Sequence, residues 1–428
     1  CIMKSFLSLS RQELLTLQAA LEKEYSAYQQ KNLKLDMSRG KPGNEQLEIS
    51  QPMLDIVSSS SDCKTRDGLD CRNYGLLDGL PSIKELFSVM LEVAPENIMV
   101  GGNSSLNMMF DTIACIMTAG IGGCTPWCKL DRVKFLCPVP GYDRHFGITE
   151  YFGIEMLPVP MTDEGPDMDL VEELVSSDDS IKGIWCVPKY SNPQGITYSD
   201  ETVRRFAKLK PAAKDFRIMW DNAYCVHDIT DHSDKLLSIM GECEKNGTED
   251  LPVLFCSTSK ITFPGSGVAA MAASKANMRV FKERYKYQTI GFDKINMLRH
   301  MLFFKNMDGV LSHMQKHKKI LAPKFQSVLE HLENSLSGTD TATWITPNGG
   351  YFVSVDVMEG CAKRVVQLCK EAGVVLTGAG ATFPYGKDPK DSNIRIAPTY
   401  PPVDELNIAM DLFCLCVKMA AVEKLLCR

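Results

Sequence analysis

One lysine of this chain is well placed for covalent chemistry. Lys260 follows the apolar run 252–256 and the hydroxyl of Ser257, and a loop with two glycines, 264–267, comes after it. The amine of a lysine held in such a loop can form a Schiff base with an aldehyde cofactor, while hydroxyls and backbone N–H groups bind the cofactor's phosphate. Because Ser-x-x-Lys occurs by chance in many loops, this interpretation depends on partners elsewhere in the chain.

Asp221 and Tyr224 are the first such partners. Asp221 ends the apolar run 217–220, and a buried carboxylate is rare unless it pairs with a cation. A protonated pyridine nitrogen would be such a cation, and its charge would keep Asp221 ionised. Tyr224 could place its hydroxyl near an oxygen on the same ring. The alternative for Asp221 is a helix N-cap.

Asn192 and Tyr142 also follow strand-like runs. Asn192 lies shortly after the run 183–187, and its amide can donate to a phenolate oxygen. A simple turn is the alternative there, since Pro193 and Gly195 favour one. Tyr142 follows the run 133–137 and could lay its ring against a flat cofactor.

A glycine-rich loop and an arginine complete the set. Residues 101–105, Gly-Gly-Asn-Ser-Ser, follow the run 97–100 and open a helix, whose first N–H groups can bind an anion. The alternative is a helix that Asn103 or Ser104 merely caps. Arg395 is flanked by apolar residues, and its guanidinium suits bidentate capture of a carboxylate.

The elements that must position these residues alternate along the chain. Strand-like runs at 97–100, 133–137, 155–159, 183–187, 217–220 and 253–256 are separated by helical stretches such as 106–117, 168–176 and 199–209. Such alternation predicts an α/β fold whose mostly parallel sheet is covered by helices on both faces. Ligands of such sheets bind at the carboxyl ends of the strands, where nearly all of the candidate residues fall.

The two ends of the chain have a different pattern. A helix is predicted over 8–31 with Ser10 as its cap, and a long helix over about 305–336. Short strand-like runs at 351–355, 374–376 and 393–396 lie among helices after it. We expect a large domain over 50–310 and a smaller α+β domain built from 1–49 and 311–428.

Composition excludes several classes of protein. The net charge of −6 over 428 residues gives no reason to expect a nucleic-acid partner. No apolar run is long enough for a membrane span, and no signal peptide is visible. The 16 cysteines are scattered, without the pattern of a disulfide framework or a zinc site. These observations predict a cytoplasmic protein with reduced thiols and no metal.

Taken together, these motifs resemble the pyridoxal-phosphate-dependent aminotransferases of fold type I, in the aspartate aminotransferase class. The resemblance rests on Asn-Pro-x-Gly at 192–195, Asp-x-x-Tyr at 221–224 and Ser-x-Ser-Lys at 257–260, in this order, and runs through almost the whole chain. The text at 74–81, 101–105 and 257–265 is similar to a bacterial subgroup related to the aminotransferase domain of MocR-type proteins. The fold implied is a sheet of the seven-stranded type sandwiched by helices, with the smaller domain beside it.

The resemblance implies a role for each matching residue. Lys260 would hold pyridoxal 5'-phosphate as an aldimine and then move the Cα proton of the substrate. Asp221 would pair with the pyridine nitrogen, and Asn192 and Tyr224 would bind the ring oxygen. Tyr142 would stack on the ring. The remaining implied cofactor contacts are Asn103, Ser104, Ser105, Ser257 and Ser266, together with Tyr74, which would reach the phosphate of the neighbouring subunit in a homodimer with shared sites.

Substrate recognition is less completely implied. Arg395 would bind the α-carboxylate, with Asn192, Gly40 and Arg39 near it. The family places an arginine about eight residues after the lysine to pair with the phosphate, but residues 264–268 contain none; Ser266 or backbone N–H groups would substitute. No second arginine for a distal carboxylate is evident either, and Arg39, Lys41 and His145 are the candidates.

These observations predict an aminotransferase that moves an amino group from an L-amino acid, with aspartate favoured, to a 2-oxo acid such as 2-oxoglutarate. Two alternatives remain. A lyase or decarboxylase could use the same cofactor and fold, because the reaction depends on which Cα bond stands perpendicular to the ring. A ligand-sensing regulator is disfavoured, because it needs a DNA-binding module and only about 35 residues precede the first site loop.

Overall fold

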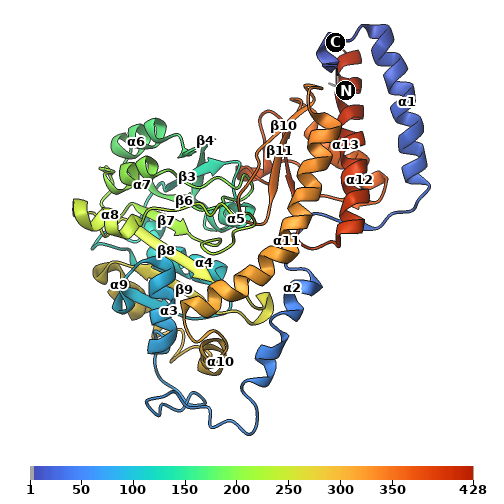
Figure 1. Cartoon of the computed structure of the whole chain (residues 1–428). Helices are drawn as coiled ribbons and strands as arrows, with labels where there is room; N and C mark the ends of the chain where they lie inside the picture. Colours follow the sequence, from blue (N-terminus) through green and yellow to red (C-terminus); the bar gives the residue numbers. More distant parts are fainter. Residues whose placement is uncertain (1–3, 428) are drawn as a thin grey trace.

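The computed structural model describes residues 4–427, which form two unequal lobes joined by one long helix (Figure 1). The larger lobe is built on an eight-stranded sheet with the order β2-β9-β8-β7-β6-β3-β4-β5. Its strands are β2 (Ile98–Val100), β3 (Lys134–Val139), β4 (Glu155–Thr162), β5 (Gly165–Pro166), β6 (Ile181–Cys186), β7 (Arg217–Asp221), β8 (Pro252–Ser257) and β9 (Ala269–Ala273).

The strand directions bring the predicted site loops to one edge of this sheet. Strands β4, β3, β6, β7 and β8 pair in parallel. Strand β9 is antiparallel to both β8 and β2, so β2 again runs in the direction of β8. All six predicted strands of this lobe are confirmed, whereas the seven-stranded form differs from the eight strands observed. Strand β9 was missed because its sequence Ala-Ala-Met-Ala-Ala lacks the β-branched and aromatic residues typical of strands.

Helices cover both faces of the sheet. One face packs against α3 (Pro81–Leu91), α6 (Met168–Ser177), α7 (Asp200–Ala207), α8 (Ile239–Asn246) and α10 (Lys294–Phe304). The other packs against α4 (Ser105–Ala119), α5 (Asp143–Tyr151) and α9 (Lys275–Tyr285). Successive strand side chains alternate between the two cores, as a pleated strand requires: Leu254 and Cys256 of β8 lie in the first, and Val253 and Phe255 in the second.

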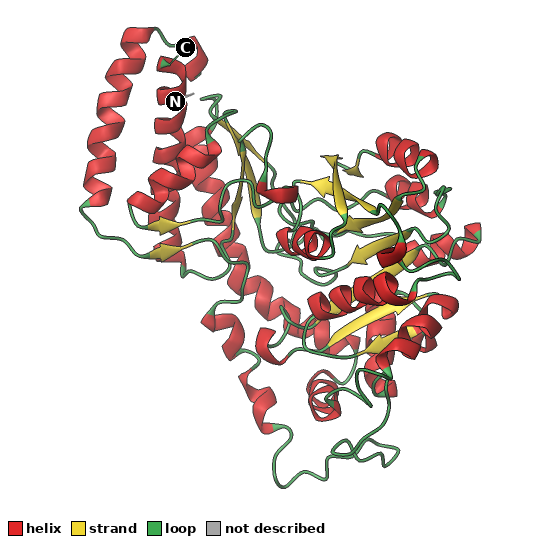
Figure 2. Cartoon of the chain, turned by 180° about the vertical axis from the view of Figure 1, so that it is seen from behind, coloured by secondary structure: helices red, strands yellow, loops and turns green. Residues whose placement is uncertain are grey.

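The smaller lobe combines both ends of the chain (Figure 2). It contains α1 (Arg11–Gln29), α12 (Ala362–Glu371) and α13 (Val403–Leu426), the parallel pair β1 (Leu35–Asp36) and β12 (Val374–Val375), and the antiparallel strands β10 (Ala342–Trp344), β11 (Val353–Val357) and β13 (Asn393–Ile396). Ser10 caps α1 as expected, in a capping box with Glu13. Leu14 and Leu21 of α1 share one core with Phe413 of α13. This packing supports the domain division predicted above, which remains a prediction.

Helix α11 (Met307–Leu336) connects the lobes over 30 residues. Val310 and Met314 pack into the sheet core, whereas Leu321 and Leu332 pack into the core of the smaller lobe. The short helix α2 (Asn44–Glu48) contacts α11. Within residues 4–427, no helix has both the length and the apolar character needed to cross a membrane.

Candidate active site

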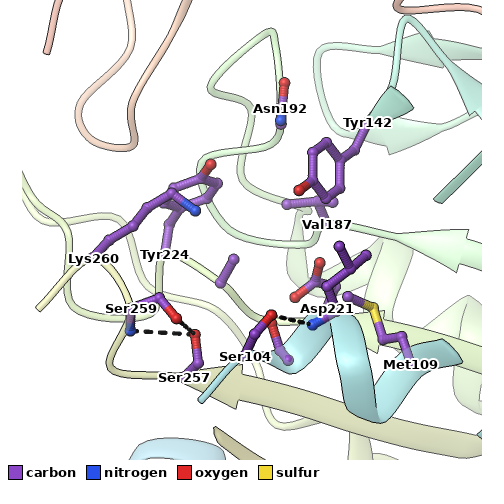
Figure 3. A pocket seen from close by; sticks show the side chains of 13 residues that line it. Ser104, Met109, Tyr142, Val187, Asn192, Asp221, Tyr224, Ser257, Ser259 and Lys260 are labelled. Atoms are coloured by element: carbon purple, nitrogen blue, oxygen red, sulfur yellow. Dashed lines mark hydrogen bonds between the residues drawn. The ribbon is translucent and has the colours of Figure 1, made fainter. Parts of the chain in front are cut away.

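A pocket lies at the carboxyl ends of the central strands, where the predicted site residues converge (Figure 3). Lys260 and Asp221 line it on different sides. The other lining residues are Ser104, Ser105, Leu106, Met109, Tyr142, Val187, Asn192, Ala223, Tyr224, Ser257 and Ser259. Eight predicted cofactor or catalytic residues therefore line one pocket, although they span 157 positions of the chain, from 104 to 260.

Lys260 enters the pocket from the turn that follows β8. Its Nζ lies 5.0 Å from the ring centroid of Tyr224 and 5.6 Å from that of Tyr351. Desolvation lowers the pKa of this amine, Asp221 partly opposes the effect, and the positive charge of Arg395 adds to it. A lysine with a lowered pKa is a better nucleophile and base near neutral pH.

Asp221 ends β7, and only one of its two carboxylate oxygens is bonded. Oδ2 lies 2.9 Å from Nε2 of His145, whereas Oδ1 is buried and has no hydrogen-bond partner among residues 4–427. The His145 ring stacks on Trp185 at 4.4 Å, and both side chains are buried. His145 was a candidate for binding a distal carboxylate of the substrate, but its place behind Asp221 contradicts that role.

Tyr142, Tyr224 and Asn192 surround the same space. Burial raises the pKa of both phenols, so Tyr142 and Tyr224 remain neutral hydrogen-bond donors at physiological pH. Tyr142 stands edge-on to the His145 ring, at 4.9 Å. Asn192 follows β6, and its Oδ1 accepts a hydrogen bond from Arg395 Nη1 at 3.2 Å.

The opposite end of the pocket is lined by hydroxyls and by the start of α4. Ser104 is the N-cap of this helix, and its Oγ accepts from Leu106 N at 3.1 Å. Ser257 Oγ donates to Ser259 Oγ at 3.2 Å, and Ser259 Oγ donates to the carbonyl of Asn103 at 3.0 Å. Ser259 was not among the predicted residues, although the Ser-x-Ser spacing could have pointed to it. Hydroxyls and free helix N–H groups together are typical of a phosphate site.

Ser266 lies outside the lining of this pocket. Its Oγ accepts a hydrogen bond from Arg299 Nη2 at 2.8 Å, and the same nitrogen donates to Asn296 Oδ1 at 2.6 Å. Arg299, on α10, thus places a guanidinium beside the loop that lacks the expected arginine. Spacing along the sequence could not have identified it, because it lies 39 positions after Lys260 on a separate helix.

Arg395 reaches the pocket from β13 in the smaller lobe. In addition to Asn192, Nη1 contacts Asp143 Oδ1 at 3.1 Å, and the guanidinium lies over the Phe352 ring at 4.6 Å. Nε is buried without a partner in the described part of the chain. Gly40 packs so closely on Phe352 that an added Cβ would lie 2.2 Å from the ring. The predicted substrate residues Gly40 and Arg395 therefore meet through Phe352.

The remaining predicted residues lie further out. Arg39 is exposed, and Lys41 Nζ lies over the Tyr400 ring at 3.8 Å. Tyr74 is 82% exposed, on the loop that projects from the larger lobe. Neither Arg39, Lys41 nor Tyr74 lines the pocket.

Histidines of α11 hold the backbone next to Lys260. The carbonyl of Ile261 accepts from His313 Nε2 at 2.8 Å and from His317 Nε2 at 2.9 Å. Gln46 Nε2 lies 2.9 Å from His317 Nδ1 and donates to Tyr351 Oη at 3.0 Å. No sequence pattern predicted these contacts.

The donor set fits pyridoxal 5'-phosphate. The unpaired Asp221 oxygen can accept from a ring N–H, the serines and α4 can bind a phosphate between them, and Lys260 supplies an amine. The sheet topology and this set of residues define a pyridoxal-phosphate-dependent enzyme of fold type I.

Comparison with known proteins agrees with that class. The family described as aspartate amino-transferase matches residues 9–428. An aspartate aminotransferase from Corynebacterium glutamicum is 45% identical over 94% of this chain and 93% of its own. The crystal structure of an aspartate transaminase from the same species superposes with a TM-score of 0.94 at 43% identity, over 97% of this chain and 99% of that one. The chain belongs to the aspartate aminotransferase family; it is an aminotransferase with pyridoxal 5'-phosphate as its cofactor.

A more distant structure shares the fold. The α-aminoadipate aminotransferase LysN of Thermus thermophilus, solved with N-(5'-phosphopyridoxyl)-L-leucine, has a TM-score of 0.74 at 17% identity and covers 97% of this chain and all of its own. At this identity the match supports the fold alone.

Proposed function

We propose that this aminotransferase takes the amino group of L-aspartate and gives it to a 2-oxo acid such as 2-oxoglutarate. The observation that carries the proposal is the pocket itself, in which the Lys260 amine and the unpaired Oδ1 of Asp221 face the space that Arg395 adjoins. Aspartate as donor is supported by the similarity to the aspartate aminotransferase of C. glutamicum.

Each residue then has a defined task. When bound, the cofactor supplies an aldehyde that takes up the amino group and a protonated ring that accepts electrons from the substrate. Asp221 Oδ1 would accept a hydrogen bond from the ring nitrogen, and His145 holds the other oxygen in place. Lys260 would hold the cofactor through its Nζ, and the same amine, once released, would take the proton from the substrate Cα. Arg395 binds the α-carboxylate, and the phenol of Tyr224 and the amide of Asn192 donate to the ring oxygen.

The phosphate is bound by neutral donors more than by charge. Ser104, Ser105, Ser257 and Ser259, together with the N-terminus of α4, can donate to it. We propose Arg299 as the nearby positive charge, because it donates a hydrogen bond to Ser266 in the loop that follows Lys260.

We further propose a homodimer in which Tyr74 completes the partner's site. Tyr74, Tyr287, Ile290 and Leu302 are exposed large side chains, and such groupings mark interaction surfaces. Lys294 Nζ donates to the carbonyl of Gly75 at 2.9 Å, which joins the Tyr74 loop to the segment that carries the others. The cytoplasm is the location we propose, since no disulfide joins the cysteines of residues 4–427.

The first prediction is that L-aspartate is the preferred amino donor, and a substrate screen on the holoenzyme tests it. Each amino acid is added without a 2-oxo acid, and the absorbance of the lysine-bound cofactor is followed while products are identified by mass spectrometry. With L-aspartate, the absorbance of the lysine-bound cofactor should decrease fastest, and the products should be oxaloacetate and pyridoxamine phosphate. The K260A protein should bind the cofactor yet show no conversion.

The other outcomes of this screen are equally informative. Release of ammonia or carbon dioxide without pyridoxamine phosphate would assign a lyase or decarboxylase. Faster conversion of an aromatic or branched amino acid would replace aspartate as the donor and leave amino transfer intact.

A further inference from the structure

Two cysteines lie next to each other directly behind the pocket. Sγ of Cys225 is 3.6 Å from Sγ of Cys256. Cys225 follows Tyr224 in the chain, and Cys256 precedes Ser257, so each thiol is one residue away from a side chain that lines the pocket. Both thiols belong to the core on the α3 and α8 face of the sheet, whereas Asp221 points to the other face.

The two thiols differ in reactivity. Cys225 is part-exposed and lines a cavity of about 440 Å³, whereas Cys256 is fully buried. Lys189 also lines this cavity, and its Nζ donates to the carbonyl of Cys225 at 3.0 Å. The neighbouring Cys256 thiol and the charge of Lys189 lower the pKa of Cys225, while the pKa of Cys256 is raised by Cys225 and by burial. A part-exposed thiol beside a cation, with a second thiol next to it, is typical of redox-sensitive cysteines.

Asp228 is the acidic partner of Lys189. Its Oδ1 lies 3.7 Å from Lys189 Nζ and also accepts a hydrogen bond from Tyr190 Oη. Glu92, Asp234 and Lys235 line the same cavity, so its charges are mixed. Lys189 is the charged residue whose amine donates a hydrogen bond to the backbone carbonyl of Cys225.

We propose that Cys225 and Cys256 form a reversible disulfide when the protein meets a peroxide, and that this bond weakens cofactor binding. The Cys225 thiolate attacks hydrogen peroxide, giving a sulfenic acid and water after one proton is taken up. The Cys256 thiol then displaces the sulfenic oxygen as a second water. In sum, two thiols lose two electrons and two protons, and one peroxide becomes two waters. A dithiol reductant restores the thiols.

The expected effect on the site follows from geometry. A disulfide requires the sulfurs to approach to about 2.05 Å, well below their present separation. The two chain segments are already joined by a hydrogen bond from Asn222 N to the carbonyl of Phe255, at 2.9 Å. Closing the disulfide draws residues 225 and 256 together, and we expect it to shift the adjoining Tyr224, in the turn after β7, and Ser257, the last residue of β8. This second half of the proposal depends on the roles proposed above for these two residues.

The pair is distinct from the other thiols of the chain. Cys369 and Cys416, another neighbouring pair, are fully buried in the smaller lobe, which shields them from peroxide. Cys128 is exposed and lies on the short 3-10 helix Trp127–Lys129 between α4 and β3, outside the lining of both the pocket and the Cys225 cavity. Oxidation at Cys128 therefore serves as the matched control.

The experiment treats the holoenzyme with increasing hydrogen peroxide, blocks the remaining thiols, and maps disulfides by mass spectrometry after proteolysis. A peptide linking residues 225 and 256 should appear and should vanish after dithiothreitol. C256A should instead accumulate a sulfenic acid at Cys225 that a dimedone probe traps, and C225S should show neither. C128S should behave as the natural sequence does. Absence of the linked peptide in the natural sequence would overturn the disulfide.

Cofactor release provides the second readout. Oxidised protein should lose bound cofactor about tenfold faster, as expected when one hydrogen bond to it is broken, and dithiothreitol should reverse the change. A linked peptide with unchanged release would overturn the effect on the site. Failure of the proposed amino transfer would alter neither the peptide map nor the release rate, so the two proposals fail separately.

Discussion

At the scale of single residues, Asp221 shows how one carboxylate is divided between two tasks. Oδ2 is held by His145, which is itself fixed by stacking on Trp185, and Oδ1, which has no partner among residues 4–427, is the oxygen that we propose for the cofactor. A buried oxygen without a hydrogen bond costs free energy, so a ring N–H of the cofactor would supply a bond that no described residue makes.

Substituting this charge gives the second prediction. D221N keeps the size of the side chain but removes the negative charge that stabilises the protonated ring. The kcat/KM of amino transfer should fall by about 100-fold or more, as is typical when a charge aimed at the reacting group is removed. Steady-state kinetics measure this effect. Retention of full activity would contradict the assignment of Asp221.

D215N is the matched control. Asp215 is also a buried aspartate near β7, but it pairs with Lys182 and Trp127 at the other end of the sheet. Its substitution should lower the free energy of unfolding and leave kcat/KM close to that of the natural sequence.

The sequence predicted pocket residues well where a residue ends a strand or lies in the loop just after it. Asp221 ends β7, and Lys260, Asn192 and Tyr142 lie in the loops after β8, β6 and β3, whose carboxyl ends the parallel sheet brings together. Residues that act through contacts distant in sequence were missed. His145 was recognised as a candidate, but for binding a distal carboxylate of the substrate. Its local sequence does not show that it contacts Asp221, which lies 76 positions further along the chain.

At the scale of elements, α11 does more than connect the two lobes. Through His313 and His317 it bonds the Ile261 carbonyl, and through Gln46 it ties α2 to the same point. The long helix was predicted from its apolar periodicity alone. Its inward histidines were not, because their partner lies 52 and 56 positions earlier in the chain.

The third prediction concerns the pH dependence of this packing. Burial lowers the pKa of His317 from an ordinary 6.5 to about 4, with neighbouring His313 adding to the effect. The unfolded chain therefore binds more protons between these values, so stability is fully present above pH 6.5 and is lost as pH falls towards 4. His317 contributes at most about 3 kcal/mol to that loss.

Urea unfolding at pH 7.5 and pH 5 tests this assignment. In H317Q the free energy of unfolding should fall less between the two pH values than in the natural sequence. H331Q is the control, since His331 lies on the same helix but is part-exposed. An identical pH dependence in H317Q and the natural sequence would remove His317 from this role.

At the scale of the whole molecule, the exposed Tyr74 has its proposed role only in a dimer, because it lies outside the pocket of its own chain. In the proposed dimer, the Tyr74 hydroxyl donates to the phosphate in the partner's site. Y74F should therefore weaken cofactor binding about tenfold, the effect of losing one such hydrogen bond, without changing the fold. Y151F, also at an exposed tyrosine, is the control.

Mixed dimers test whether Tyr74 acts in the site of the partner subunit. When Y74F and K260A subunits are combined, one of the two sites in each mixed dimer has an intact Lys260 and an intact Tyr74 from opposite subunits. That site should bind cofactor with the affinity of the natural sequence. If mixing restores nothing, Tyr74 does not act across the interface.

The core of the smaller lobe is built from α1 and α13, which are far apart in the sequence, and this has a consequence for biosynthesis. Helix α1 leaves the ribosome well before α13, yet its apolar side chains pack on α13, and Arg11 Nη1 donates to the carbonyl of Leu426 at 3.1 Å. The larger lobe can form while synthesis continues, because domains fold as units. Leu14, Leu21 and Tyr25 therefore stay without these packing partners until α13 has been synthesised, and the apolar face of α1 is exposed during that interval.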